Sequence, residues 1–255
     1  MLNKFIKHVL RNNDRCNIYP SDVKTSIHDR QDVCNDEVPS TMVSGLMWLH
    51  RHNFMVNAVI DVGASNGSWS KECMKYFTNA KYILCEPQPV HFESLNSFRY
   101  SCEQDIVIVQ KAIGQSDGKA LFSAIDPYGG VVVTTSDNAY VIEVEMTTID
   151  TIVSTLLDKG PYLIKLDTHG TEKSILNGAC LALENTEILI VEAYNYRIMD
   201  DALLFWELCA FLAKKGFRPI NIVDLMCREY DNSLWQMDIF FIKDTWKGFE
   251  HVSYK

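Results

Sequence analysis

The stretch from Ile60 to Gly67, which reads IDVGASNG, has the residue types that a ligand-binding turn requires. An apolar run ends there in Asp61 and continues into a turn that contains Gly63 and Gly67, ahead of an amphipathic segment. Gly63 allows the backbone to turn sharply, and Gly67 allows a helix to begin close to the sheet, so that unpaired helix N–H groups face a ligand. The stretch therefore predicts a nucleotide-binding corner.

The spacing of these glycines indicates which kind of nucleotide binds. A dinucleotide fingerprint needs a third glycine, as G-x-G-x-x-G, whereas Gly63 and Gly67 are spaced G-x-x-x-G. Asp61 would also repel a phosphate. The corner favours a nucleoside that carries a cationic amine or sulfonium, and S-adenosylmethionine carries both. We expect this cofactor to be held by the residues of the turn, which are Asp61, Gly63, Ala64, Ser65, Asn66 and Gly67.

Two further strand ends complete the expected cofactor site. Glu86 closes the next apolar run, at about the distance along the chain, roughly 20 residues, that places an acid on a ribose diol. Lys111 and Ala112 follow the third run, where they would lie beside the base, and the small side chain of Ala112 leaves room for adenine.

Two later strand ends carry groups for proton transfer. Asp167 and His169 follow one buried apolar run, and Glu192 ends the next, so we expect all three at the same edge of the sheet. Methyl transfer is an in-line displacement, and an alcohol acceptor must also lose its proton. We expect His169 to be the base, with Asp167 or Glu192 as its orienting partner. The alternatives are that Asp167 only fixes the loop or holds the cofactor amine, and that His169 only caps the next helix.

No metal is expected at this edge. Asp167 and Glu192 could bind a divalent cation, but the sequence shows no obvious third ligand beside these two carboxylates.

The elements that position these residues can be read from the apolar pattern. From Val56 onward, short apolar runs alternate with helical stretches, which is typical of a parallel sheet with crossover helices. We expect strands over 56–62, 81–86, 106–111, 162–167 and 187–192, and helices over 68–77, 89–100, 149–157, 172–183 and 202–215. The last two runs, 218–225 and 235–242, should pair antiparallel.

Between residues 114 and 148 the rhythm breaks, and three short strands are expected in place of a crossover helix, as a small β-insertion. The fold class is therefore α/β, with a Rossmann-like, mostly parallel sheet.

Three parts are expected along the chain. Residues 1–55 form an N-terminal helical extension, with a helix in residues 1–11, a polar connector over 12–37 and a second helix opened by Pro39. Residues 56–245 form the cofactor-binding domain, and residues 246–255 form a C-terminal tail.

Composition limits the classes of partner. With 47% hydrophobic residues, the chain of 255 residues can bury a core. Its formal net charge of -9 argues against nucleic acid, which requires a basic face. No segment is long enough for a signal peptide or a transmembrane helix, and the cysteines are scattered, so we expect a cytoplasmic protein without a transmembrane segment.

Six motifs in order make the chain similar to a known family. They are Ile60–Gly67, Cys85–Pro87, Lys111–Gly114, Thr147–Asp150, Leu163–Asp167 and Leu234–Asp238. In these the chain resembles the FkbM-type methyltransferases, which depend on S-adenosylmethionine. The resemblance implies a class I methyltransferase sheet of seven strands with an antiparallel last hairpin, and it adds Pro87 to the cofactor site. It also implies methylation of a hydroxyl on a sugar or a natural-product ring. One departure is that His169 stands where the family usually has an acid.

The leading hypothesis is thus an O-methyltransferase acting on a carbohydrate or a glycosylated or natural-product small molecule. The alternatives are a nicotinamide-dependent oxidoreductase, or a cofactor-binding module without catalysis in a complex of glycan-synthesis enzymes. Homo-oligomer formation stays open. Three aromatic residues either stack on a sugar acceptor or are buried in the core: Tyr194, Tyr196 and Trp235.

Overall fold

A computed structural model describes residues 38–134 and 140–254. The helix expected in residues 1–11 and the polar connector over 12–37 lie outside these ranges. The second expected helix is present as α2 (Met42–Arg51), whose N-cap is Thr41. The side chain of Thr41 accepts a hydrogen bond from the Ser44 backbone N–H at 3.2 Å, which satisfies a donor that the helix start leaves unpaired.

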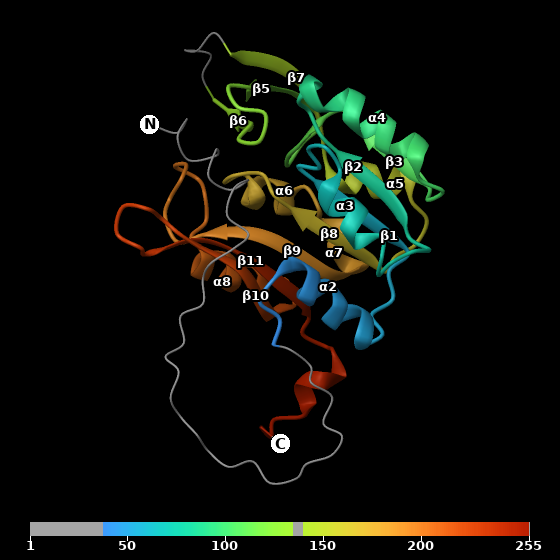
Figure 1. Ribbon diagram of the computed structural model, residues 1–255, viewed down its shortest axis with the longest axis vertical. Helices are drawn as coiled ribbons and strands as arrows, with labels where there is room; N and C mark the ends of the chain where they lie inside the picture. Colours follow the sequence, from blue (N-terminus) through green and yellow to red (C-terminus); the bar gives the residue numbers. More distant parts are fainter. Residues whose placement is uncertain (1–37, 135–139, 255) are drawn as a thin grey trace. The chain divides into compact units, whose positions relative to one another are not determined.

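Seven strands form the main sheet in the order β10-β11-β9-β8-β1-β2-β3 (Figure 1). Five of them, β9, β8, β1, β2 and β3, pair with one another in parallel, and β11 pairs antiparallel with both β9 and β10. Their bounds are β1 (Ala58–Val62), β2 (Lys81–Cys85), β3 (Ile106–Val109), β8 (Tyr162–Leu166), β9 (Thr186–Tyr194), β10 (Phe217–Cys227) and β11 (Leu234–Lys243). The mostly parallel sheet with an antiparallel C-terminal hairpin is confirmed.

Helices cover both faces of this sheet, because its central strands are apolar on both sides. Every residue of β1 and β8 is buried. One face packs against α2, α3 (Ser68–Cys73) and α4 (Phe92–Ser101), through Leu46, Cys73 and Leu95 among others. The other face packs against α5 (Ile149–Leu156), α6 (Glu172–Asn177), α7 (Cys180–Glu184) and α8 (Phe205–Ala213).

Some bounds differ from those expected. The single helix predicted over 172–183 is two helices, α6 and α7, separated at Gly178. The backbone of the insertion crosses there, and a Cβ on Gly178 would lie 2.3 Å from the Gly114 carbonyl oxygen. The strand predicted over 187–192 continues to Tyr194, because its pairing with β11 extends to Tyr194 opposite Gln236. Helix α8 begins at Phe205 rather than at Ala202. At this helix start, the Glu207 carboxylate accepts a hydrogen bond from the Leu204 N–H.

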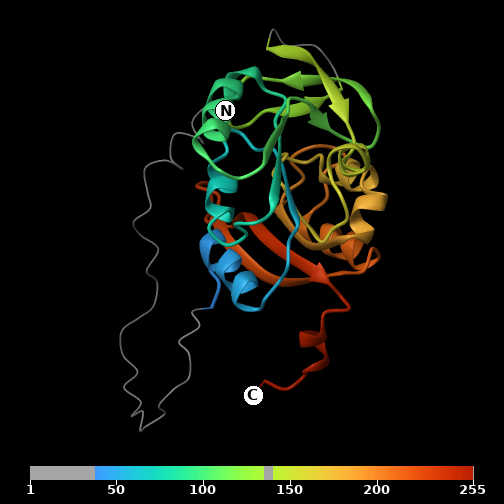
Figure 2. The same ribbon diagram turned by 90° about the vertical axis from the view of Figure 1, so that its right-hand side faces the viewer.

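The β-insertion forms a second sheet of four strands in the order β4-β7-β5-β6. Their bounds are β4 (Ala112–Ile113), β5 (Gly118–Ser123), β6 (Val131–Val133) and β7 (Val141–Thr147). This sheet precedes α5, which still leads back to β8, so the insertion adds to the crossover helix and does not replace it. Figure 2 shows the small sheet at one end of the large one.

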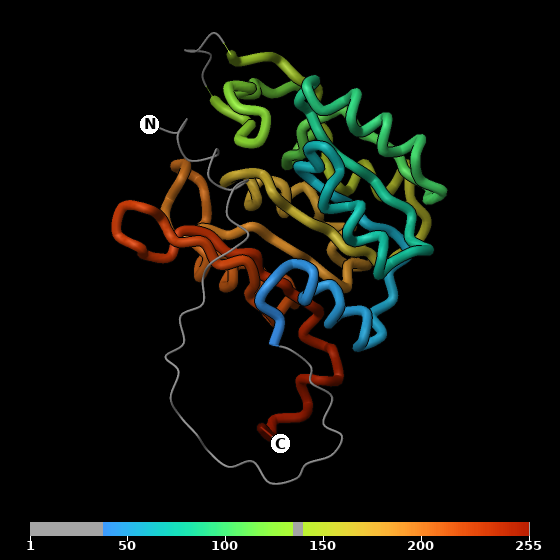
Figure 3. The backbone as a smooth tube through the Cα atoms, viewed as in Figure 1, coloured from blue at the N-terminus to red at the C-terminus, as the bar shows by residue number. Residues whose placement is uncertain are grey.

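The C-terminal segment packs beside α2, although the two are far apart in the sequence (Figure 3). The ring of Trp246 lies 5.7 Å from that of Trp48 and 5.9 Å from that of Phe54, and the short helix η3 (Lys247–Glu250) follows it. The predicted domain bounds at residues 55 and 245 stay predictions. No helix in the described ranges is long and apolar enough to cross a membrane.

Candidate functional site

The turn after β1 lies directly against the end of β8. Gly63 has a φ of 80°, and a Cβ at this position would stand 2.1 Å from the backbone oxygen of Asp167. The N–H groups of Gly63 and Ala64 donate to the carbonyl oxygen of Cys85 at 3.0 and 3.1 Å, which ties the turn to the end of β2. Only glycine allows this approach, and the turn thereby joins the ends of three strands.

Asp61 is fully buried at this corner. Its Oδ2 accepts a hydrogen bond from the Ser70 hydroxyl at 2.7 Å, while Oδ1 has no hydrogen-bond partner and lies 3.7 Å from the Lys165 ammonium. Burial raises the pKa of Asp61, and the charge of Lys165 opposes that shift. A buried carboxylate oxygen without a hydrogen bond fits a site that a cationic ligand group completes.

Glu86 is held in place by two backbone groups. Its Oε2 accepts from the Ser65 N–H and its Oε1 from the Gln88 N–H, both at 2.8 Å. Burial raises the pKa of Glu86, although these two hydrogen bonds favour its ionised form. Each oxygen has further acceptor capacity, which fits the two hydroxyls of a ribose.

The remaining predicted cofactor residues lie in the turn after β1 and after β2 and β3. The Asn66 side chain accepts from the Ser68 N–H at 3.1 Å, at the start of α3. Lys111 is exposed, and Ala112 is buried in β4. The roles predicted for Pro87 beside Glu86, and for Lys111 and Ala112 beside the base, stay predictions.

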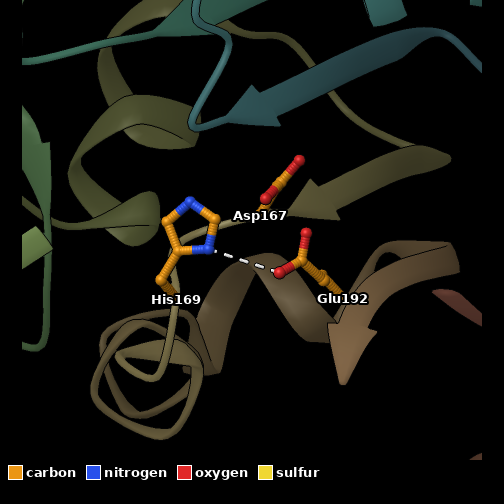
Figure 4. Close-up of side chains that lie close together, drawn as sticks. All are labelled: Asp167, His169 and Glu192. Carbon is orange, nitrogen blue, oxygen red and sulfur yellow. Dashed lines mark ion pairs between the residues drawn. The ribbon is translucent and has the colours of Figure 1, made fainter. Parts of the chain in front are cut away.

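The three predicted catalytic residues converge (Figure 4). Asp167 and His169 follow β8, and Glu192 lies in the neighbouring strand β9. One ligand-type atom from each of the three lies within 4.8 Å of the other two, and His169 Nδ1 lies 3.3 Å from Glu192 Oε1. The structure thus brings together the residues that the strand ends predicted.

Both imidazole nitrogens of His169 have protein partners. Nδ1 lies 2.9 Å from the Tyr194 hydroxyl, and Nε2 lies 3.0 Å from the backbone oxygen of Tyr128. The Tyr194 hydroxyl donates to Glu192 Oε1. His169 has a φ of 55°, in the left-handed region that costs a non-glycine residue free energy and is often found at functional sites.

The charges of these residues depend on one another. Burial would lower the pKa of His169, but its hydrogen bond to Glu192 and the charges of Glu192 and Asp167 raise it to about 10. Burial raises the pKa of Glu192 well above its ordinary value, and the nearby charge of Asp167 raises it further. Burial acts to raise the pKa of Asp167, yet the ammonium of Lys165, 2.9 Å away, keeps it below its usual range. With both nitrogens occupied and its pKa raised, His169 holds a proton at neutral pH. The predicted role of His169 as the base, with Asp167 or Glu192 as its orienting partner, stays a prediction.

Three residues of the site were not predicted in these roles. Lys165 bridges Asp61 and Asp167 from within β8, and strand alternation was the available signal, because it places Lys165 on the same face as Asp167. Tyr194, considered above as a sugar-stacking residue, is buried with its hydroxyl in the cluster. Tyr128 comes from the β-insertion, and no sequence pattern connects it with His169.

A turn of the β-insertion contacts two loops of the site. The backbone oxygens of Asp126, Pro127 and Tyr128 face, in that order, Gln88 Nε2 at 3.1 Å, His91 Nε2 at 2.6 Å and His169 Nε2 at 3.0 Å. The insertion therefore fixes the loop that follows Glu86 relative to the loop that carries His169.

Two surface hollows, of about 590 and 470 Å³, lie at the opposite edge of the sheet. Their lining includes Asn57 and Lys81 in one and Gly160 and Pro161 in the other, all close to the amino ends of strands. In an open α/β sheet, ligands bind at the carboxyl ends. We therefore place the candidate site at the corner and the cluster and not at these hollows.

Several solved structures are similar to this chain. No curated protein matches the sequence. Among matching solved structures, the magnesium protoporphyrin IX methyltransferase of Synechocystis PCC 6803, with bound S-adenosylmethionine, is 11% identical, with a TM-score of 0.46 over 78% of this chain and 76% of that one. The N-methyltransferase NodS of Bradyrhizobium japonicum is 8% identical, with a TM-score of 0.47 over 79% and 93%.

The 1,6-didemethyltoxoflavin-N1-methyltransferase of Burkholderia thailandensis, solved with its substrate and S-adenosylhomocysteine, is 10% identical, with a TM-score of 0.44 over 78% and 76%. At such low identities and TM-scores, these likenesses carry no argument about acceptor or reaction.

A family model also matches the sequence, over most of the described domain. The model of the methyltransferase FkbM domain matches residues 61–219, which is more than half of the chain and includes Asp61, Glu86 and the whole Asp167–His169–Glu192 cluster. A methyltransferase, and not a nicotinamide-dependent oxidoreductase, is what this match supports. The chain belongs to the FkbM family of methyltransferases, and its cofactor is S-adenosylmethionine.

Proposed function

We propose that this methyltransferase acts on oxygen, and that its acceptor is a hydroxyl of a carbohydrate or of a glycosylated or natural-product small molecule. The observation that carries the proposal is the convergence of Asp167, His169 and Glu192 beside the cofactor corner. An alcohol is a weak nucleophile until its proton is removed, whereas a neutral amine can attack without that step. A cluster of proton-accepting groups at this place therefore supports a hydroxyl acceptor.

The residues of the corner fit the cofactor. The Asp61 oxygen without a hydrogen bond suits the cofactor's amine, and Glu86 suits the ribose hydroxyls. When bound, S-adenosylmethionine supplies an electrophilic methyl group on its sulfonium. The protein's part is to orient the acceptor and to take its proton, which we assign to the His169–Glu192 pair. Lys165 keeps Asp167 ionised and in position.

Labelled S-adenosylmethionine and fractionated cell glycans and small molecules test the proposal. We expect label in a methyl ether, with the methylated oxygen located by mass spectrometry. Glu192→Gln should reduce turnover by about 100-fold, the order expected when a general base is lost, with little change in cofactor affinity. Glu145→Gln removes an exposed acid of β7 and serves as the matched control.

Two results would contradict the proposal. Label found on nitrogen or carbon would show a different acceptor class. Cofactor binding without transfer to any fraction would favour a binding module that serves a complex of glycan-synthesis enzymes.

A further inference from the structure

We infer that Asp167, His169 and Glu192 together bind one divalent cation of the Mg²⁺ or Mn²⁺ type, and that this ion holds the acceptor hydroxyl. The part that concerns the acceptor rests on the proposed function, whereas the ion site rests on the geometry of the three side chains. The sequence showed two carboxylates without a third ligand, and the structure supplies that ligand as His169.

The spacing of the three side chains suits a common centre. Their ligand atoms lie within 4.8 Å of one another. Such ions take ligands at roughly 2.0–2.6 Å, so two ligand atoms on one ion are separated by at most about 4–5 Å. One imidazole with two carboxylates is a ligand set that intermediate and hard divalent ions accept.

The hydrogen bonds of His169 point to a cation at Nδ1. The Tyr128 carbonyl can only accept, so Nε2, 3.0 Å away, carries a hydrogen. In the neutral ring, Nδ1 then presents a lone pair towards Glu192 Oε1 at 3.3 Å, and the hydrogen of Tyr194 is donated to that same carboxylate. Two acceptors that face each other require a cation between them, which is either a proton or a metal ion. Histidines that bind metals commonly donate their other N–H to a backbone carbonyl in this way.

Both carboxylates also have partners outside the three ligands. Lys165 donates to Asp167 Oδ2 at 2.9 Å, and Tyr194 donates to Glu192. Supporting hydrogen bonds of this kind orient the ligands of protein metal sites. Each of the three side chains therefore has a group that holds it in a ligating position.

The charge of the surroundings favours a further cation. Asp61 pairs with Lys165 across β1 and β8, and Asp238 pairs with Glu192 across β11 and β9, so these side chains share one face of the sheet with Asp167. Four carboxyl groups on this face stand against one cationic side chain of the strands, Lys165. A divalent ion would balance the remaining negative charge.

The ion would act on the acceptor hydroxyl. With the ion bound, His169 and Glu192 are its ligands, so the coordinated hydroxyl gives its proton to water and not to that pair. Its oxygen forms the new bond to the methyl carbon, and the carbon–sulfur bond breaks with its electron pair returning to sulfur, which leaves S-adenosylhomocysteine. Three protein ligands leave about three positions on an octahedral ion. Two neighbouring hydroxyls of a sugar fill two of them, so the site would select acceptors with a vicinal diol.

Binding of Mn²⁺ to the chelator-treated full chain, followed by electron paramagnetic resonance, tests the ion site. We expect about one Mn²⁺ per chain in the wild type, and affinity at least tenfold weaker in His169→Ala and Glu192→Gln, as for lost metal ligands. Tyr194→Phe keeps the ring and removes only the supporting hydroxyl, so it should weaken binding less. Glu145→Gln should bind as the wild type does. Absence of Mn²⁺ binding, or equal binding in all variants, would overturn the inference.

Methyl transfer measured with chelator, and after Mn²⁺ or Mg²⁺ is restored, separates this inference from the proposed function. We expect chelator to stop transfer while calorimetry still shows cofactor binding. Undiminished transfer in chelator would refute the ion's role and leave the O-methyltransferase standing. Stoichiometric Mn²⁺ binding without methylation of any hydroxyl would refute the proposed function and support the ion site.

Discussion

The protein fixes the orientation of the Glu86 carboxylate before any ligand binds. Two backbone N–H groups, from Ser65 and Gln88, hold its two oxygens at 2.8 Å. Side chains fixed in this way lose little conformational freedom on binding, so that more of the interaction energy appears as affinity.

Replacing Glu86 with Gln should therefore weaken cofactor binding. The variant loses a charged acceptor for the ribose hydroxyls, which is worth about 1.5–3 kcal/mol, or roughly ten- to a hundredfold in Kd. Isothermal titration with S-adenosylmethionine measures the change. Glu93→Gln, at an exposed position of α4, is the control. Equal Kd values for the two variants would remove Glu86 from the cofactor site.

Glu172 supports a prediction about pH. Burial raises its pKa above the ordinary value of 4.5, while its Oε1 accepts from Gly170 N–H at 2.9 Å and from the Thr168 hydroxyl at 3.0 Å. The folded state therefore keeps a proton that the unfolded chain releases, and stability falls as pH rises from about 4.5 to the raised pKa.

Glu172→Gln can keep both hydrogen bonds at its amide oxygen but does not titrate. We expect the difference in Tm, wild type minus Glu172→Gln, to decrease as the pH is raised from 4 to 8. Thermal unfolding followed by circular dichroism measures this difference. A constant difference in Tm across that range would show that folding does not raise the pKa of Glu172.

At the scale of elements, the site depends on how closely the ends of β1, β2 and β8 approach one another. The turn after β1 makes this approach, with Gly63 against the backbone of Asp167. The alternation of apolar runs and helical stretches predicted these strands and their order of appearance. It did not predict the division of 172–183 into α6 and α7, because the cause is the backbone of a remote segment at Gly114.

Gly63 and Gly216 allow the effect of backbone strain to be compared with the effect of a steric clash. Gly63 and Gly216 have φ values of 80° and 79°, but a Cβ on Gly216 would meet nothing nearer than 3.7 Å. Gly216→Ala should therefore cost about 1–2 kcal/mol, the left-handed penalty alone. Gly63→Ala adds a collision with backbone at 2.1 Å and should cost several kcal/mol, and it should also abolish cofactor binding. Thermal unfolding of both variants tests this, and equal losses in Tm would contradict it.

At the scale of the whole described molecule, segments outside the expected domain bounds complete the packing. Trp246, assigned to a tail from the sequence, lies in an aromatic group with Trp48, Phe54 and Phe249. Within those bounds, the β-insertion reaches from its own sheet to His169.

Trp246→Ala should lower the free energy of unfolding by about 2 kcal/mol, less than the roughly 3–5 kcal/mol of a fully buried aromatic because Trp246 is half-buried. Trp206→Ala removes the same side chain from α8, where Trp206 is 49% exposed, and should cost under about 1 kcal/mol. Denaturant unfolding of both variants gives the comparison. A loss at Trp246 no larger than at Trp206 would make residues 246–254 a tail, as the sequence indicated.

The sequence by itself determined the class of fold and the strand ends that carry Asp61, Glu86, Asp167 and Glu192. These follow from local patterns, because the carboxyl ends of parallel strands always meet at one edge of a sheet. Only the tertiary structure decided what those groups do to one another. The proton on His169 is fixed by the Tyr128 carbonyl of a remote insertion, and the charge of Asp167 by Lys165 on its own strand. Hydrogen bonds and charges act through space, so their partners cannot be read from spacing along the chain.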